Sequence, residues 1–235
     1  MIESLLPAGV HCAEAFGDPA DAALLPEEES LVAHAVPHRR RECATVRHLA
    51  RQALAELGCP PVPLLRGKHG APLWPDGVVG SMTHCHGYRA AVVAERGRVA
   101  SVGIDAEPHA PLPDGVLDVV SLAADRDHLA ALRHQEPLIN WDCLLFSAKE
   151  AVYKTWYPLT GAWLDFSDAQ LTFHPAGRSF HAQVLATGVA EAREAGVAET
   201  DVPLEFTGRW AVRKGLAVTA IVATAMAVTT SRSQA

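Results

Sequence analysis

The chain has 235 residues and a mass of 25.0 kDa, enough for one large domain or two small lobes. Hydrophobic residues make up 49% and charged residues 20% of the chain, as is typical of a soluble globular protein. With 20 basic and 27 acidic residues the net charge is −7, so the overall charge does not indicate a nucleic-acid-binding protein.

The cysteines and the apolar segments indicate in which cellular compartment the protein is expected. The five cysteines are odd in number and none has Cys-x-x-Cys spacing, which disfavours a disulfide framework and predicts a reducing, cytoplasmic location. The first ten residues lack a basic region and contain Glu3, so they do not resemble a signal peptide. The apolar run at residues 216–228 is too short to cross a bilayer and predicts a buried strand, and we expect no membrane partner.

Two helices are predicted near the start of the chain. Residues 19–36 combine small apolar and acidic residues, and Pro37 interrupts this pattern. Residues 38–57 carry apolar side chains at helical spacing and are followed by the stop signals Gly58 and Pro60. Arginines gather in the N-terminal half of the second helix, where the helix dipole disfavours them. They either face an external anion or form a solvated surface.

A loop and three strands are predicted next. Residues 59–77 are rich in proline and glycine, and Trp74 within them indicates an ordered loop that packs on something. Between the second and third strands, Arg96-Gly97 predicts a tight hairpin. The three strands are expected at residues 78–84, 88–95 and 98–105.

The second half repeats the order of a helix followed by strands. After a loop at 108–115, residues 116–134 predict one or two short helices. Residues 138–157 predict a long helix that Pro158 and Gly161 end. Lys214-Gly215 predicts a turn between the last two of four strands. These strands are expected at residues 169–174, 180–185, 209–213 and 216–224. The order predicts an α+β protein with two similar lobes, each an antiparallel sheet packed with a long helix.

Two acidic segments carry the main chemical signal. Asp105 and Glu107 are two positions apart at a strand end and therefore point to one side. Glu150 and Lys154 are four apart and share a helix face. Three converging carboxylates would repel one another without a cation, which predicts a Mg²⁺ site, with Mn²⁺ as the alternative, beside a lysine suited to phosphate. The alternatives are a solvated strand end and an exposed ion pair worth about 0.3–0.5 kcal/mol.

A third candidate segment surrounds His84. A zinc site is not supported, because neighbouring strand residues face opposite sides and His84, Cys85 and His86 have no second ligand pair at metal spacing. His84 is expected either to bind a phosphate or to be a core histidine, and the backbone near Ser81 and Thr83 can cradle an anion. The chain lacks the P-loop, the G-x-G-x-x-G and the G-x-S-x-G motifs, so common nucleotide and hydrolase sites are not indicated.

Together these segments resemble a known family. Gly103-Ile104-Asp105-Ala106-Glu107 and Phe146-Ser147-Ala148-Lys149-Glu150-Ala151-Val152-Tyr153-Lys154 resemble the two signatures of the 4′-phosphopantetheinyl transferase superfamily, in its monomeric, broad-specificity, surfactin- and enterobactin-synthetase-type class. The resemblance runs from about residue 38 to 166. It implies two similar α+β lobes with coenzyme A in the cleft between them, and we expect an N-terminal lobe at 1–108 and a C-terminal lobe at 109–235.

The resemblance also implies a reaction. A serine of an apo acyl or peptidyl carrier protein would attack the β-phosphate of coenzyme A, accept phosphopantetheine and release 3′,5′-ADP. The alternatives are a homologue that binds coenzyme A without catalysis and a metal-dependent phosphohydrolase acting on coenzyme A or the holo-carrier. The carrier would offer an acidic helix, so a local docking patch must overcome the unfavourable net charge of −7.

Residue roles follow from the resemblance. Asp105, Glu107 and Glu150 would hold the metal, and Glu150 would act as general base, directly or through a metal-bound water. Lys154 would stabilise the leaving phosphate and His84 would bind the pyrophosphate. The full set of residues expected to contact coenzyme A is Arg39, Arg47, Arg66, Ser81, Met82, Thr83, His84, Asp105, Lys149 and Lys154.

Overall fold

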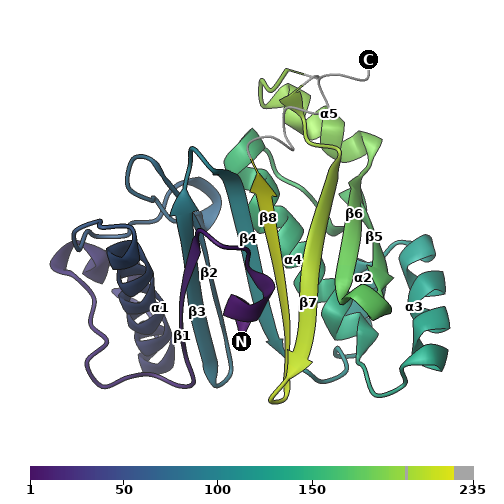
Figure 1. Cartoon of the computed structure of the whole chain (residues 1–235), viewed down its shortest axis with the longest axis horizontal. Helices are drawn as coiled ribbons and strands as arrows, with labels where there is room; N and C mark the ends of the chain where they lie inside the picture. Colours follow the sequence, from purple (N-terminus) through teal and green to yellow (C-terminus); the bar gives the residue numbers. More distant parts are fainter. Residues whose placement is uncertain (199–200, 225–235) are drawn as a thin grey trace.

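Two antiparallel sheets stand side by side in the computed structural model, which describes residues 1–198 and 201–224 (Figure 1). The smaller sheet has the order β1-β3-β2, with strands Val10–Ala15, Tyr88–Glu95 and Val78–Cys85. The larger sheet has the order β4-β8-β7-β6-β5, with strands Val99–Pro108, Leu216–Thr224, Glu205–Arg213, Ser179–Val184 and Ala169–His174.

A long helix covers each sheet. Helix α1 (Pro37–Glu56) packs Leu49 and Leu54 against Val93 of the smaller sheet. Helix α4 (Trp141–Thr160) buries Trp156 against the larger sheet. The α+β fold with two similar lobes is therefore confirmed. The remaining α-helices are α2 (Val116–Val120), α3 (Ala123–Gln135) and α5 (Ala186–Glu194).

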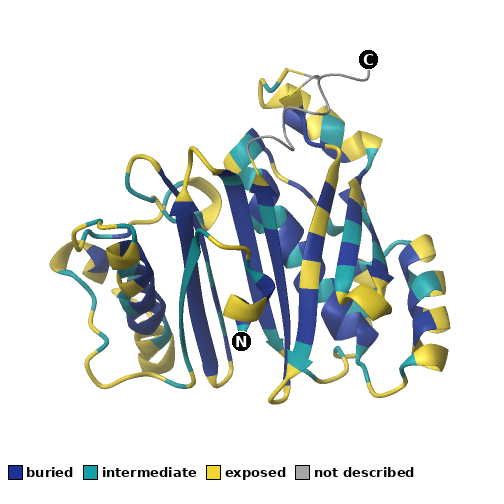
Figure 2. Ribbon diagram, in the orientation of Figure 1, coloured by how far each residue is buried: buried dark blue, intermediate teal, exposed yellow. Residues whose placement is uncertain are grey.

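The two sheets also share a core on the face away from α1 and α4. Ile2, in the N-terminal turn Ile2–Leu5, packs in one cluster with Tyr88 of β3, Ile104 of β4 and Val218 of β8. Figure 2 shows that the strands at the centre of the molecule are buried over most of their length. The strands β3 and β4 are therefore covered on both faces, which ties the lobes into one body.

Side-chain hydroxyls join the two sheets where β2 and β4 run side by side. The Ile104 amide donates to Ser81 Oγ at 3.1 Å, and the Ala106 amide donates to Thr83 Oγ1 at 3.2 Å. The paired residue numbers rise together, so the two strands are parallel. Ser81 and Thr83 thus satisfy buried amides that would otherwise lack acceptors at this junction.

The predicted hairpin between the second and third strands is wrong. Strand β3 pairs with β1 on one edge and β2 on the other, so neither edge is free for β4. After Arg96-Gly97 the chain crosses to the larger sheet, where β4 pairs with β8. The hairpin is instead formed by β2 and β3, whose turn contains Gly87 with φ +75°. Glycine adopts that backbone conformation at little cost.

The predicted helix at 19–36 is also wrong. Only Pro26–Val32 is helical, as a 3₁₀ helix, because Pro26 removes an amide donor and restricts the residue before it. The carboxylate of Glu28 accepts from the Leu25 amide at 2.9 Å and caps this short helix. Helix α4 continues through Pro158 and ends where Gly161 has φ +66°.

Two elements, one near each end of the chain, were not predicted from the sequence, while the other elements of the second half agree with its pattern. Helices α2 and α3 lie within the predicted helical segment, and β5 and β8 have the predicted bounds. Strand β1 and helix α5 were not predicted. The predicted apolar run at 216–228 forms β8 up to Thr224, and its later residues lie outside the described part of the chain. Among the described residues, none of the helices has the length and apolarity needed to cross a membrane.

We propose a lobe boundary at residues 96–98 in place of the expected boundary at 108. Strand β4 ends at Pro108 but pairs with β8 along its length, so it belongs to the larger sheet. The chain changes sheets between Glu95 and Val99. Limited proteolysis within this link, followed by separation of the fragments, would test the boundary.

Gly103 allows β4 to lie directly against α4. A Cβ added there would meet Ala151 O at 2.1 Å and Thr155 Oγ1 at 2.4 Å, both closer than atoms can pack. We expect Gly103→Ala to destabilise the protein by about 1–3 kcal/mol or more, because the backbone of α4 must shift. Gly97→Ala is the matched control, since its Cβ meets nothing within 4 Å. Equal urea midpoints for the two variants would contradict this account.

Candidate active site

A cleft of about 670 Å³ lies between the lobes. Its walls come from α1, the proline-rich loop after it, β2 and α4. The predicted site residues that line it are Arg47, Arg66, Ser81, Met82, His84, Glu150 and Lys154. A smaller hollow of about 260 Å³ adjoins the cleft, shares His69, Glu150 and Tyr153 with it, and is walled by Trp163 and Phe166. Because the two hollows share Glu150 and these two neighbours, they are described together as the groove.

The two acidic segments converge as predicted. Asp105 is 3% exposed, and the Lys154 ammonium donates to its Oδ1 at 2.7 Å. Lys154 also donates to Ile104 O at 3.3 Å, and the Thr83 hydroxyl donates to Asp105 Oδ1 at 3.3 Å. Strand β4 therefore delivers Asp105 to the face covered by α4, while its neighbours Ile104 and Ala106 point into the shared core.

Negative charge exceeds positive charge at this point. Burial, with Asp105 nearby, raises the pKa of Glu107 to about 7. Burial also raises the pKa of Glu150, and the nearby Asp105 carboxylate raises it further. The pKa of Lys154 is raised: burial alone would lower it, but Asp105, Glu150 and Glu107 outweigh that effect. Three carboxylates share one ammonium, which favours binding of a further cation.

The donor set fits a hard divalent cation. Asp105 Oδ2 is buried and has no hydrogen-bond partner, so one carboxylate oxygen is already free of water and unsatisfied. Carboxylate oxygens are the ligands that Mg²⁺ prefers. Across residues 1–198 and 201–224, no three His, Cys, Asp or Glu side chains are already arranged to hold a metal. In this arrangement the Lys154 ammonium occupies Oδ1 of Asp105.

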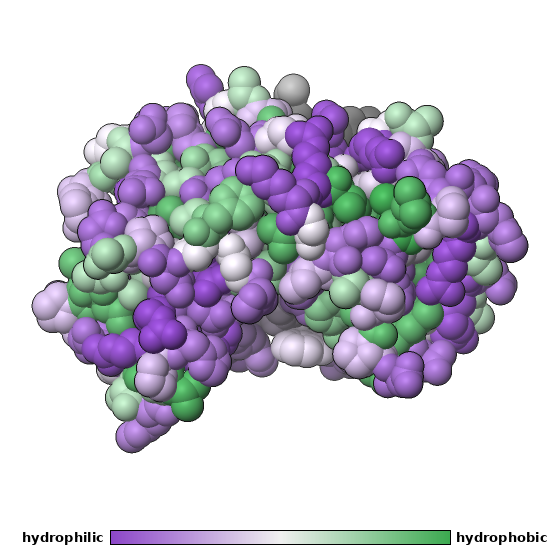
Figure 3. All heavy atoms as spheres, turned by 90° about the horizontal axis from the view of Figure 1, so that it is seen from below, coloured by the Kyte–Doolittle hydropathy of each residue, from purple (hydrophilic) through white to green (hydrophobic). Residues whose placement is uncertain are grey.

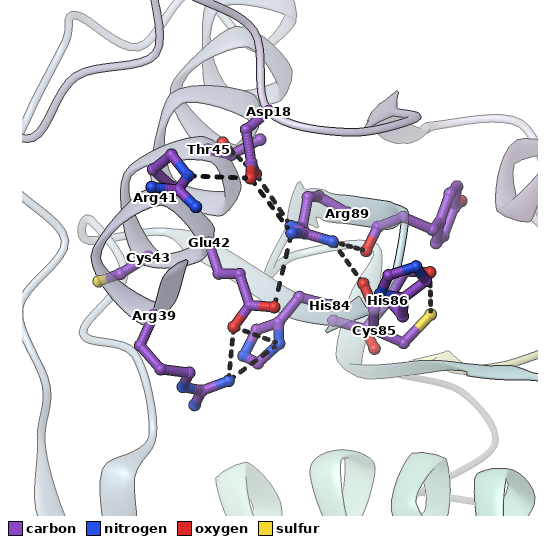
Figure 4. A network of polar contacts seen from close by, with 12 residues as sticks. Asp18, Arg39, Arg41, Glu42, Cys43, Thr45, His84, Cys85, His86 and Arg89 are labelled. Carbon is purple, nitrogen blue, oxygen red and sulfur yellow. Dashed lines mark hydrogen bonds and ion pairs between the residues drawn. The ribbon is translucent and has the colours of Figure 1, made fainter. Parts of the chain in front are cut away.

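His84 lies in a polar network at the edge of the cleft (Figure 4). Arg39 Nη1 is 3.4 Å from His84 Nδ1 and 2.7 Å from Glu42 Oε2. Burial and the Arg39 guanidinium lower the pKa of His84. The imidazole is therefore neutral near pH 7, where it can donate one hydrogen bond to a ligand in the cleft.

The other predicted arginines differ in exposure. Arg47 is 4% exposed, donates from Nε to Leu64 O at 2.9 Å and lies 4.0 Å from Glu28 Oε1. Arg66 is exposed on the loop after α1, and both arginines line the cleft. One is thus held rigidly and the other is free to adjust to an anion.

Comparisons with known proteins identify the family. Residues 27–94 match the 4′-phosphopantetheinyl transferase N-terminal domain, and residues 101–207 match the 4′-phosphopantetheinyl transferase superfamily. The chain is 52% identical to 4′-phosphopantetheinyl transferase Svp of Streptomyces mobaraensis, covering 99% of this chain and 93% of that protein. The chain belongs to the 4′-phosphopantetheinyl transferase superfamily.

Two further relatives extend over nearly the whole chain. Identity is 48% to 4′-phosphopantetheinyl transferase Npt of Nocardia iowensis, covering 94% of this chain and 99% of the relative. Identity is also 48% to 4′-phosphopantetheinyl transferase PptT of Mycobacterium tuberculosis, covering 94% of this chain and 97% of that relative. The likeness therefore includes both lobes and the cleft between them.

One expected ligand residue of this transferase, Lys149, lies in the wall of the smaller hollow and is held there in a buried ion pair. Lys149 is 3% exposed and forms a 2.7 Å ion pair with the fully buried Asp125. Its ammonium also donates to Phe166 O at 2.7 Å, and Asp125 accepts from the Leu122 and Leu171 amides, each at 2.9 Å. Lys149 is one position from Glu150, so the helix turns it toward α3 and β5. These contacts indicate a structural role for Lys149, and its contact with substrate phosphates stays a prediction.

Four more predicted residues, Thr83, Asp105, Glu107 and Arg39, are not among those that line the cleft. Thr83, Asp105 and Glu107 lie behind it, and Thr83 serves the junction between the sheets. Ser81 and Met82 line the cleft from β2, whose main chain is paired with β3. Arg39 reaches the cleft through its contact with His84.

Sequence reasoning missed several residues of the groove. The His69 ring lies 5.5 Å from the Tyr157 ring and 5.9 Å from the Trp163 ring, so the loop of the first lobe reaches aromatic residues of the second. The buried hydroxyl of Tyr153 has no hydrogen-bond partner among the described residues. The sequence did contain a signal for Tyr153, because it follows Glu150 by three positions and shares its helix face. His69 carried no local signal, since only the fold brings its loop to α4.

Proposed function

We propose that the protein transfers 4′-phosphopantetheine from coenzyme A to a serine of an apo acyl or peptidyl carrier protein and releases 3′,5′-ADP. The observation that supports this most directly is the groove in which Arg47 and Arg66 of one lobe face Glu150 and Lys154 of the other. Arginines suit the phosphates of coenzyme A, while the aromatic hollow beyond Glu150 suits its less polar arm.

Glu150 is proposed as the general base. The serine oxygen forms a bond to the β-phosphorus, and the bond from that phosphorus to the bridging oxygen of the pyrophosphate breaks. The serine proton passes to the Glu150 carboxylate, and 3′,5′-ADP leaves with the bridging oxygen. Burial raises the pKa of Glu150, which makes the carboxylate a stronger base than an exposed one. Glu150 is half-buried and lines the cleft, which gives the serine access to it.

Asp105, Glu107 and Glu150 are proposed to hold Mg²⁺, with Mn²⁺ as the alternative. When bound, the ion would neutralise charge on the pyrophosphate. Lys154, now paired with Asp105, would be released toward the leaving phosphate. His84 would donate to the pyrophosphate from the other lobe, and Arg39, Arg47 and Arg66 would hold the nucleotide phosphates.

We further propose a cytoplasmic monomer of the broad-specificity class that acts on carrier proteins and needs neither nucleic acid nor a membrane. With a net charge of −7, long-range attraction to an acidic carrier is unfavourable, so short-range contacts must recognise it. Figure 3 shows polar and apolar side chains mixed over the lower face of both lobes. Such a mixed face is typical of transient rather than obligate contacts.

The test is an intact-mass measurement on the full chain with coenzyme A, Mg²⁺ and a panel of apo carrier proteins. We expect a gain of one phosphopantetheine per carrier, which is lost on chelation of the metal and regained when Mg²⁺ or Mn²⁺ is added. No gain with any carrier, together with measurable coenzyme A binding, would indicate a non-catalytic homologue. Release of phosphopantetheine without a carrier would indicate a phosphohydrolase.

A further inference from the structure

The carboxylate of Glu42 lies at the centre of the network in Figure 4. Its Oε2 accepts from Arg39 Nη1 at 2.7 Å and is 3.8 Å from His84 Nδ1. Its Oε1 is 3.5 Å from Nη2 of Arg89. Three elements, α1, β2 and β3, thus present side chains to one carboxylate on the border of the cleft.

The distances around His84 favour one tautomer of its imidazole. Arg39 is always protonated and can only donate, so the 3.4 Å contact with His84 requires Nδ1 to be the acceptor. The alternative, an Nδ1–H donating to Glu42 Oε2, would span 3.8 Å and exceed hydrogen-bond range. Nε2 therefore carries the proton of the neutral imidazole. His84 lines the cleft, so this N–H is the donor that it offers to a ligand there.

The position of Glu42 is itself supported from a buried arginine. Arg89 is 5% exposed, donates from Nε to Asp18 Oδ1 at 3.1 Å and from Nη1 to Tyr88 O at 3.0 Å. Asp18 also accepts from the Thr45 hydroxyl at 2.9 Å. The main chain and Asp18 thus hold Arg89 in place, so its guanidinium is a fixed positive charge beside Glu42. Arg39, whose side chain is 51% exposed, depends on Glu42 for its orientation.

We propose that Glu42 is a positioning residue: it holds Arg39 against His84 Nδ1 and thereby keeps the Nε2–H of His84 available to coenzyme A phosphates. This inference rests on the proposed function for its consequence in catalysis, but the tautomer itself does not depend on turnover. Loss of Glu42 frees Arg39 and removes the donor that keeps Nδ1 unprotonated. Both nitrogens of His84 can then carry the proton.

The first experiment reads the tautomer directly. Long-range ¹H–¹⁵N NMR spectra of the free full-length protein distinguish the two ring nitrogens, and His84→Gln identifies the resonance. We expect the Nε2–H form in the wild type, a shift toward Nδ1–H or a mixture in Glu42→Ala, and recovery toward the wild-type form in Glu42→Asp. If Glu42→Ala does not fold, Glu42→Gln, which keeps the side-chain volume, replaces it in this measurement. An unchanged tautomer in both the Ala and Gln variants would overturn the proposal.

The second experiment measures kinetics in the carrier mass-shift assay. Glu42→Ala should raise KM for coenzyme A by about 10-fold, the effect of losing one hydrogen bond to a charged group, with a smaller change in kcat. Glu56→Gln, an exposed glutamate on the same helix, is the matched control and should change neither. A kinetic effect without a tautomer change would also overturn the proposal. If the wild type fails to transfer but the tautomer responds as expected, the proposed function fails while the role of Glu42 in orienting His84 stands.

Discussion

We expect Glu150→Gln to reduce phosphopantetheine transfer by about 10²–10⁴-fold, the usual contribution of a general base. The substitution removes the proton acceptor and one proposed metal ligand but keeps the shape of the side chain. Glu150 lines both hollows, and its pKa is raised by burial, so the ionised form adds no stability that glutamine would lose. The measurement is the initial rate of carrier mass gain at saturating coenzyme A, with circular dichroism to confirm folding.

Glu191→Gln is the matched control, because Glu191 is exposed on α5 and away from the groove. It should transfer at the wild-type rate. Full activity in folded Glu150→Gln would remove Glu150 from the role of base. Activity that falls equally in both variants would show that the loss is unrelated to the groove.

We expect Asp125→Asn and Lys149→Met each to lower the free energy of unfolding by about 3–5 kcal/mol, as when one partner of a buried ion pair is removed. The pair is 2.7 Å apart, and its two side chains are 2% and 0% exposed. It joins α3, α4, the turn at Phe166 and β5, so its loss also loosens the wall of the smaller hollow. The double variant should lose less than the sum of the single variants, because neither charge is then left alone.

Urea unfolding of the two single variants and the double variant measures this coupling. The exposed Arg98–Glu95 pair provides the control, and Arg98→Met should cost at most about 1 kcal/mol. The same variants test the structural role of Lys149. A Lys149→Met protein with wild-type stability and a large loss of coenzyme A affinity would support phosphate binding by Lys149 and contradict the structural role.

Local patterns predicted the elements that have their signals within a few residues. Helix α4 follows from apolar residues at helical spacing, and the shared face of Glu150 and Lys154 follows from helix periodicity. The ion pair of Lys154 with Asp105 was not predicted, because it joins two distant segments. The helix expected at 19–36 failed because Pro26 and the Glu28 cap act against a weak pattern. The expected hairpin failed because pairing depends on which strand edges are free, and that is a property of the whole sheet.

The same division holds for the active site. The amino-acid sequence alone identified the side chains that we propose for the chemistry: Asp105, Glu107, Glu150, Lys154 and His84 are recognisable from spacing and residue type. Tertiary structure decided where those side chains point. It buried Lys149 with Asp125, brought His69 to the aromatic residues of the other lobe and set Glu42 between Arg39 and Arg89. Periodicity fixes the face of a helix or strand, but the partner on that face comes from a distant segment, and only packing of the two sheets selects it.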